Sequence, residues 1–190
     1  MMLAIAVLTC ARTAAADDAW LASAKLGGIV PLDGLWPFVA GGVELGYAHG
    51  ELAFVVDLDY TQPTTTGSET DPRVAGGTYS WTLTEQELGI MPAVIYRFTE
   101  MTPVTPYGGV GPRLLLARST VHDNGAPMFV ATREQSTRIG IGVPIGVELP
   151  LGPGRAIAEL LLQYGTLNHV VTGEATTGAI TASVGYRMFL

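Results

Sequence analysis

The sequence predicts an all-β protein, more specifically an eight-stranded antiparallel up-and-down transmembrane β-barrel. Apolar and polar residues alternate along eight segments, each of about ten residues or more, the length that a tilted strand needs to cross a bilayer. Charged residues make up only 14% of the chain and the mean hydropathy is +0.34, yet no apolar run approaches the roughly 20 residues of a membrane-spanning helix. A barrel reconciles these observations, because alternation confines its hydrophobicity to one face of each strand.

The first three segments alternate along their whole length. Segment 20–30 sets alanine, leucine and valine on one face against serine, lysine and glycine on the other. Segment 38–47 sets valine, leucine and tyrosine against glycine and glutamate, and segment 51–60 sets leucine, phenylalanine and tyrosine against alanine, valine and aspartate. Each segment therefore has one face suited to lipid and one suited to a narrow polar interior.

The fourth and fifth segments contain prolines and one irregular stretch. Segment 79–98 alternates well in its second half, but Trp81 and Leu83 fall on its polar face, so we expect its start to project beyond the membrane or to carry a bulge. Segment 105–117 sets valine, proline and leucine against glycine and arginine. Proline lacks the N–H of a ladder hydrogen bond, so we also expect bulges at three strand positions, Pro92, Pro112 and Pro144.

The last three segments include the most regular ones. In segment 138–149, isoleucine, valine and leucine alternate with glycine, proline and glutamate. Segment 155–164 sets alanine, leucine and tyrosine against arginine, glutamate and glutamine. The closing segment, 180–190, keeps the period of two to the end of the chain, and only Phe189 is out of character as an apolar residue on the polar face. This is the pattern that the closing strand of a barrel needs.

The connections between the segments alternate in length. In outer-membrane barrels, short turns lie at the periplasmic rim and long loops face outside, and an even number of strands places both termini on the periplasmic side. We expect the first two long loops to be the contact surfaces of the protein. Short turns are predicted at 48–50, 99–103 and 150–154, long loops at 61–78, 119–133 and 165–176, and a connection of intermediate length at 31–37.

The polar face of the segments fits an enclosed lumen better than a water-exposed surface. It is rich in glycine, which destabilises an exposed strand but makes room inside a narrow barrel. It also carries basic and acidic residues in equal number, and enclosed charges must be paired because an unpaired one has a large desolvation penalty. The predicted lumen charge network consists of Lys25, Glu44, Asp57, Asp59, Glu87, Arg97, Arg113, Arg138, Glu148, Arg155, Glu159 and Arg187.

Aromatic residues on the apolar face fall near the ends of the segments. Aromatic girdles lie at the two membrane interfaces, where the ring is buried and its polar edge is wet. We expect Tyr60 and Tyr164 at the outer rim and the other members at the periplasmic rim. The predicted girdle consists of Trp20, Tyr47, Tyr60, Tyr96, Phe98, Tyr164 and Tyr186.

The N-terminus predicts an export signal. A short apolar stretch precedes three alanines at 14–16, which form a small-residue cleavage site, so we expect residues 1–16 to be a cleaved signal and residues 17–190 to form the barrel domain. The usual basic start is missing, which indicates a true start further upstream, and an ordinary N-terminal helix is the alternative interpretation. Cys10, the only cysteine, lies within this signal; a lipid-modified Cys10 is an alternative that its preceding residues match poorly.

Two stretches add to the strand count and the loop asymmetry: Pro-Ala-Val-Ile-Tyr-Arg-Phe at 92–98 and the terminal Gly-Tyr-Arg-Met-Phe-Leu at 185–190. With these features, residues 19–190 resemble the small eight-stranded outer-membrane β-barrels that are similar to the transmembrane domain of outer-membrane protein A. That family usually ends on an aromatic residue, whereas this chain ends on Leu190. The resemblance implies a monomer in a Gram-negative-type outer membrane, surrounded by its lipid and inserted by the barrel-assembly machinery with periplasmic chaperones.

No motif in the chain indicates catalysis or a cofactor. The formal net charge is −7 and no basic run occurs, which argues against nucleic acid as a partner. Ser119, His122 and Asp123 are neighbours in one predicted loop, and Thr166 and His169 in another, but neither spacing matches a catalytic motif. The adjacent histidine and aspartate are weak evidence for a metal site, so we predict none.

We therefore expect a non-enzymatic outer-membrane protein with a structural or surface-interaction role and a lumen plugged by salt bridges. Two alternatives stay open. One is a narrow, porin-like channel for ions or small apolar solutes, which conductance in planar bilayers would reveal. The other is a secreted soluble barrel that binds a lipid-like ligand inside, which would stay in the periplasmic fraction.

Overall fold

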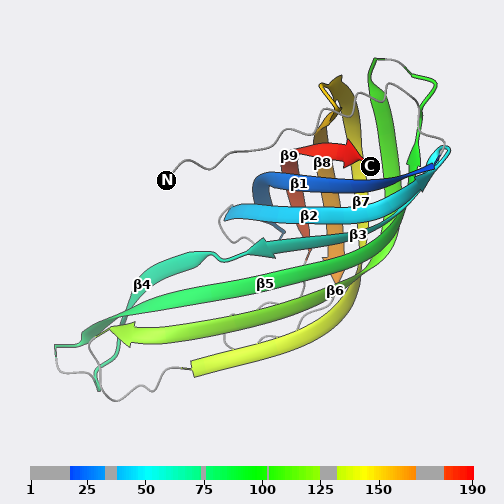
Figure 1. Ribbon diagram of the computed structural model, residues 1–190. Helices are drawn as coiled ribbons and strands as arrows, with labels where there is room; N and C mark the ends of the chain where they lie inside the picture. Colours follow the sequence, from blue (N-terminus) through cyan, green and yellow to red (C-terminus); the bar gives the residue numbers. More distant parts are fainter. Residues whose placement is uncertain (1–17, 33–37, 74–75, 102, 125–131, 166–177) are drawn as a thin grey trace, which may run out of the picture.

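The computed structural model describes residues 18–32, 38–73, 76–101, 103–124, 132–165 and 178–190, which form one antiparallel sheet (Figure 1). None of these residues belongs to a helix long and apolar enough to cross a membrane. The strands are β1 (Asp18–Pro31), β2 (Phe38–His49), β3 (Leu52–Thr61), β4 (Thr64–Thr70), β5 (Thr78–Arg97), β6 (Thr105–Asn124), β7 (Thr132–Leu151), β8 (Gly154–Gly165) and β9 (Ala179–Phe189).

The sheet closes into a barrel of eight staves, where a stave is one strand position in the closed ring. Its strand order is β3-β2-β1-β9-β8-β7-β6-β5-β4, and a further pairing between β3 and β5 closes the ring. β3 and β4 belong to one stave, because both pair with β5 in one continuous register: Leu52 lies opposite Tyr96, and Thr64 lies opposite Thr84. Pro63, which has no N–H to donate, lies between them. The predicted eight-stranded antiparallel β-barrel is confirmed.

Part of the sheet continues beyond the barrel at one end. β5, β6 and β7 have 20 residues each, whereas β1 has 14 and β8 has 12. Figure 1 shows β4 and the adjoining parts of β5, β6 and β7 extending together past the ends of β1, β2 and β3. We call this part, residues 64–70, 78–86, 118–124 and 132–137, the projecting sheet. It lies at the extended end of the barrel, and the connections β2–β3, β5–β6 and β7–β8 lie at the opposite, turn end.

The projecting sheet corrects the predicted long loops. The predicted loop 61–78 contains β4, and the predicted loop 119–133 is partly strand, because β6 and β7 extend into it. Threonine recurs in these stretches and favours strands, although apolar and polar residues do not alternate there. Trp81 and Leu83 lie in this sheet in unbroken register with β6, so the irregular start of β5 projects and carries no bulge.

The bulges predicted at the strand prolines are wrong. The β5–β6 pairing lapses at 91–93 and resumes in the same register, which places Pro92 opposite Pro112. The β6–β7 pairing lapses in the same way where Pro144 lies opposite Gly109. Each proline lacks a backbone N–H, so the ladder loses hydrogen bonds at these pairs, and two of the three prolines share one pair. Because the register is the same on both sides, neither strand has the extra residue that defines a bulge.

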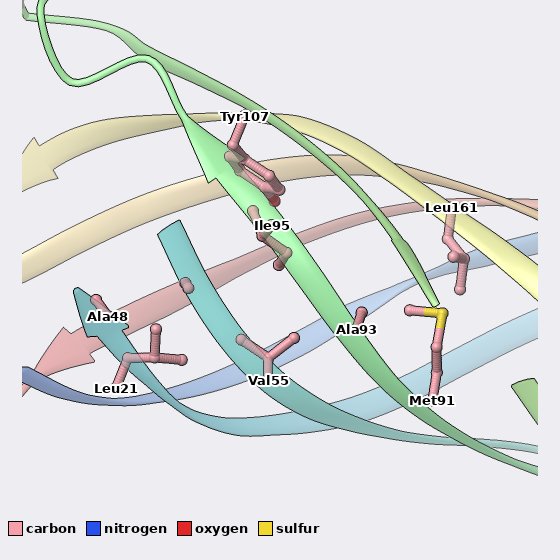
Figure 2. Packing of buried hydrophobic residues seen from close by; sticks show 9 residues of the cluster. Leu21, Ala48, Val55, Met91, Ala93, Ile95, Tyr107 and Leu161 are labelled. Carbon is pink, nitrogen blue, oxygen red and sulfur yellow. The ribbon is translucent and has the colours of Figure 1, made fainter. Parts of the chain in front are cut away.

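Each strand turns its apolar face outward and its polar face into the barrel. The lumen is also partly apolar, and Figure 2 shows such side chains gathered inside the ring of strands. A smaller cluster of Ile29, Ala40 and Ala179, with Phe38 packed against it, lies toward the extended end. Glycines make room for the larger groups: a Cβ on Gly146 would come within 2.5 Å of the Tyr107 ring. The main cluster comprises Leu21, Ala48, Ala53, Val55, Met91, Ala93, Ile95, Tyr107 and Leu161.

Candidate functional site in the barrel lumen

The distribution of side chains is inverted relative to that of a water-soluble barrel. Large apolar residues face outward and are strongly exposed, for example Val39 at 71%, Ile139 at 75% and Val184 at 66%. Charged residues are buried inside instead, with Glu148 and Arg187 both at 0% exposure. Soluble proteins rarely expose apolar patches of more than a few hundred Å². The outer surface therefore needs an apolar surrounding, and the lumen is the candidate site.

The first group of lumen charges lies near the turn end. The Arg187 guanidinium, from β9, pairs with the carboxylate of Glu44 at 2.6 Å and also with that of Glu148 on β7. Arg97, from β5, pairs with Glu148 at 3.0 Å. Ser23 links the two sides, because its hydroxyl donates to Glu44 at 2.9 Å and accepts from the Arg187 Nε at 3.0 Å. Strands from different sides of the barrel are thereby joined across the lumen.

Arg155 and Thr105 complete this first group. Arg155, from β8, lies 3.4 Å from the Glu148 carboxylate and donates to the hydroxyl of Thr105 at 2.9 Å. Phe189 packs beneath two guanidinium groups, with its ring centroid 4.7 Å from Arg97 Cζ and 5.8 Å from Arg155 Cζ. The apolar residue that breaks the pattern of the closing segment thus faces the lumen as a cation–π partner.

The second group is centred on Lys25 of β1. Its ammonium lies 2.9 Å from Asp57 on β3 and 2.9 Å from Glu159 on β8, and 4.0 Å from Glu44 of the first group. The Tyr107 hydroxyl donates to the other oxygen of Glu159 at 2.9 Å. Lys25 therefore holds carboxylates from opposite sides of the barrel, and the two groups form one continuous network.

The third group lies toward the extended end. Arg113 on β6 donates to Asp59 on β3 at 2.6 Å. Glu87 accepts a hydrogen bond from the Gln163 amide at 3.3 Å, and Arg138 donates to the backbone carbonyl of the preceding residue at 3.0 Å. Ten of the twelve residues named from the sequence as lumen charges take part in the ion pairs described above.

Sequence reasoning missed several uncharged members of the network. Ser23, Tyr107 and Gln163 occupy polar-face positions of their strands, so the alternation itself places them in the lumen. The prediction considered charged residues only, so it did not include these uncharged side chains. Phe189 also occupies a polar-face position, but an apolar residue there gave no indication that its ring would pack against guanidinium groups in the lumen.

The seven girdle residues all lie on the outer face. Trp20 packs edge-to-face on Tyr47, with ring centroids 5.4 Å apart, and Tyr96 packs on Phe98 at 4.9 Å. Both pairs lie toward the turn end. Tyr186 lies there too and donates to the Leu151 carbonyl at 2.7 Å. At the extended end are two tyrosines near the ends of β3 and β8, Tyr60 and Tyr164.

The described residues hold no catalytic group of the kind considered from the sequence. Ser119 is buried on the lumen-side face of β6, whereas His122 is exposed on the other face, because residues three apart in a strand point in opposite directions. Thr166 and His169 lie outside the described residues. Within the described part, no cluster of three histidine, cysteine, aspartate or glutamate residues could hold a metal ion.

Comparisons with known proteins agree with this architecture. No family model and no curated protein matches the sequence. Among solved structures, Neisserial surface protein A is similar at 22% identity over 92% of this chain and 97% of that one, with a TM-score of 0.51. A major outer membrane protein from Thermus thermophilus is similar at 15% identity over 90% of this chain and 100% of that one, with a TM-score of 0.59. The chain has the fold of small outer-membrane β-barrels.

Proposed function

We propose that the chain is an outer-membrane β-barrel with a structural or surface-interaction role, whose lumen is plugged by its ion pairs. The inverted distribution of side chains carries this proposal. A band of exposed apolar residues around the barrel matches the hydrocarbon of a bilayer, which also requires every strand to be paired in a closed ring. A secreted soluble barrel would need the opposite arrangement, with the apolar face inside.

The ends of the barrel fit the two interfaces of such a membrane. The aromatic pairs Trp20–Tyr47 and Tyr96–Phe98 lie at the turn end, and Tyr60 and Tyr164 lie at the extended end. Beyond the level of Tyr60 and Tyr164 the outer face of the strands becomes polar, and in the projecting sheet it carries threonine, serine and glutamine. We therefore place the turn end in the periplasm and the projecting sheet outside the cell.

The lumen network supports a structural rather than a catalytic role. Its charges are buried and come from strands on all sides of the barrel, so each ion pair ties distant staves together. Removing one partner of such a pair leaves an uncompensated buried charge, which is strongly destabilising. The network thus favours one closed arrangement of the interior, and we assign the protein no enzymatic activity.

Its partners follow from the same placement. The outer face would be covered by outer-membrane lipid, with the barrel monomeric within its own membrane. Export would use a cleaved signal at residues 1–16, and insertion would use the barrel-assembly machinery and periplasmic chaperones. The two similar structures are described as a surface protein and as a major outer membrane protein, which agrees with this role.

Two measurements test the proposal. In membrane fractionation with flotation, we expect the protein to float with the outer membrane and to resist extraction by salt or alkali. Recovery in the soluble periplasmic fraction would contradict membrane insertion. Purified protein in planar bilayers is then expected to show no steady conductance.

A narrow aqueous path is the second candidate. Asp57 Oδ1 and two nitrogens of Arg113, Nε and Nη1, are buried without a hydrogen-bond partner among the described residues. Buried polar atoms in proteins are normally satisfied, often by water. A reproducible single-channel current carried by the inserted barrel would favour this path over a plugged lumen.

A further inference from the structure

β4 is the one strand of the described sheet with a single partner. It stands at the end of the strand order and pairs only with β5, through seven residues. Figure 1 shows it at the margin of the projecting sheet, beyond the closed ring of the barrel. An edge strand presents backbone N–H and C=O groups that can pair with another strand. β4 is therefore a candidate site of strand addition.

Two hydrogen bonds show which β4 residues face the open side. The Glu85 N–H donates to the carbonyl of Pro63 at 3.1 Å, and the Asp71 N–H donates to the carbonyl of Gly77 at 3.0 Å. Because backbone groups alternate in direction along an antiparallel strand, the odd-numbered residues of this stave bond β5. The backbone groups of the even-numbered residues point away from β5. These residues are Thr64, Thr66, Ser68 and Thr70.

This edge lacks the usual protection against strand addition. Natural edge strands are blunted by lysine, proline, bulges or inward charges. β4 has the sequence Thr-Thr-Thr-Gly-Ser-Glu-Thr, with no lysine and no proline, and it pairs with β5 in a regular register. Its single charge, Glu69, is an odd-numbered residue whose backbone faces β5. The strand is thus regular in its pairing and rich in β-branched residues, and no other described strand covers its outer side.

We propose that β4 pairs antiparallel with β4 of a second copy of this chain, about a two-fold axis through Gly67. In that register Thr66 lies opposite Ser68 of the second copy, and Thr64 lies opposite Thr70. All four outward-facing backbone positions of each strand then exchange hydrogen bonds. Hydroxyl side chains face hydroxyl side chains, a favourable cross-strand combination, and Glu69 faces Thr65 rather than a like charge.

Trp81 gives this axis a second feature. It lies opposite Gly67 in the β4–β5 register, and a Cβ on that glycine would come within 2.5 Å of indole Cε2 and 3.0 Å of Cη2. The indole therefore lies over the backbone of β4, as only a glycine permits. In the paired arrangement the two indoles flank the axis on the lumen-side face, where each would lose water-exposed apolar surface.

The orientation of the sheet indicates where the second copy is. The projecting sheet continues the barrel wall, so the line perpendicular to it lies roughly in the plane of the membrane (Figure 1). The two-fold axis of an antiparallel pair is perpendicular to the sheet, so here it lies in the plane of the membrane. A rotation by half a turn about such an axis turns the second barrel upside down, so the two barrels lie in two membranes that face each other. This inference rests on the proposed outer-membrane location. A seven-residue contact is small and weak alone, but many copies on two surfaces act together.

Vesicle aggregation tests the inference. The full chain is inserted into phosphatidylcholine vesicles, insertion is verified by flotation and by heat-modified gel mobility, and aggregation is followed by light scattering. We expect wild-type vesicles to aggregate, and Thr66→Pro, which removes an outward-facing N–H and leaves the N–H groups that bond β5, to reduce scattering to that of protein-free vesicles. The matched control Thr66→Val keeps the N–H and should aggregate like the wild type.

The outcomes separate this inference from the proposed function. Inserted wild-type protein that does not aggregate vesicles, or Thr66→Pro that aggregates them as well as Thr66→Val, would overturn β4 pairing and leave the barrel intact. Wild-type protein that fails to insert would overturn both proposals.

Disulfide formation tests the register itself. The side chains of a hydrogen-bonded pair are close enough for a disulfide after small adjustments, since their Cα atoms are about 5.5 Å apart. Thr66→Cys vesicles are mixed with Ser68→Cys vesicles under mild oxidation. We expect cross-linked dimers in the mixture and few in either population alone, because like positions are not opposite. Equal cross-linking in all three samples would contradict the register.

Discussion

At the scale of single residues, Glu148 is the most heavily paired group of the lumen. Three guanidinium groups, from Arg97, Arg155 and Arg187, converge on its carboxylate, whose exposure is 0%. We expect Glu148→Gln, which keeps the shape but removes the charge, to lower the free energy of unfolding by about 3–5 kcal/mol, because the cations are left facing one another. Urea unfolding in lipid vesicles, followed by tryptophan fluorescence, measures this change.

A matched control separates the loss of a lumen charge from the loss of any acidic residue. Glu69→Gln makes the same change on the exposed projecting sheet, where we expect an effect within about 0.5 kcal/mol. Arg113→Ala should behave like the lumen variant, because it leaves Asp59 without its cation. Melting temperatures in heat-modified gel assays that are equal for the wild type and all three variants would show that the lumen charges do not stabilise the barrel.

A second prediction at this scale concerns the turn between β4 and β5. The side-chain hydrogen bonds from Arg73, helped by its backbone N–H at 2.9 Å, lower the pKa of Asp71 to about 2. A lowered pKa stabilises the turn above the unfolded value of roughly 3.9, and this contribution is lost as the pH falls through about 2. In Arg73→Ala we expect the pKa of Asp71 to rise toward the unfolded value. Carboxyl carbon NMR from about pH 2 to about pH 5 measures it, and an unchanged titration would refute the assigned cause.

At the scale of elements, the β5–β6 ladder is interrupted where Pro92 faces Pro112. The register on both sides is the same, so the backbone is positioned for hydrogen bonds that proline cannot donate. We expect Pro92→Ala and Pro112→Ala each to stabilise the barrel by about 0.5–1.5 kcal/mol, and the double variant by roughly the sum. Unfolding free energies in vesicles measure the gain. Destabilisation in either single variant would mean that the strands are not close enough to pair there.

The elements also show how far sequence reasoning reaches in this protein. Within the membrane level, lipid on one side and a narrow lumen on the other force a period of two, so the alternation alone assigns Lys25 and Arg187 to the lumen face. Beyond that level both faces meet water and the constraint disappears, which is why the sequence predicts a loop where β4 lies. The pairing of Pro92 with Pro112 depends on the register between strands, and a single sequence does not contain it.

At the scale of the whole molecule, the proposed orientation sets the turn end in the periplasm and the projecting sheet outside. Ser68, on β4, and Pro153, in the β7–β8 turn, lie at opposite ends of the structure, and both are exposed. We expect Ser68→Cys to react with a membrane-impermeant maleimide in intact cells. Pro153→Cys should react only after the outer membrane is permeabilised.

The background for this labelling experiment comes from the chain itself. Cys10 is the only cysteine and lies in the predicted signal, so the processed wild-type protein should stay unlabelled under both conditions. Labelling of the wild type would mean that the first 16 residues are retained. The reverse pattern of labelling would mean that the barrel has the opposite orientation in the membrane. The projecting sheet would then lie in the periplasm, and β4 could not pair with a second copy in a facing membrane.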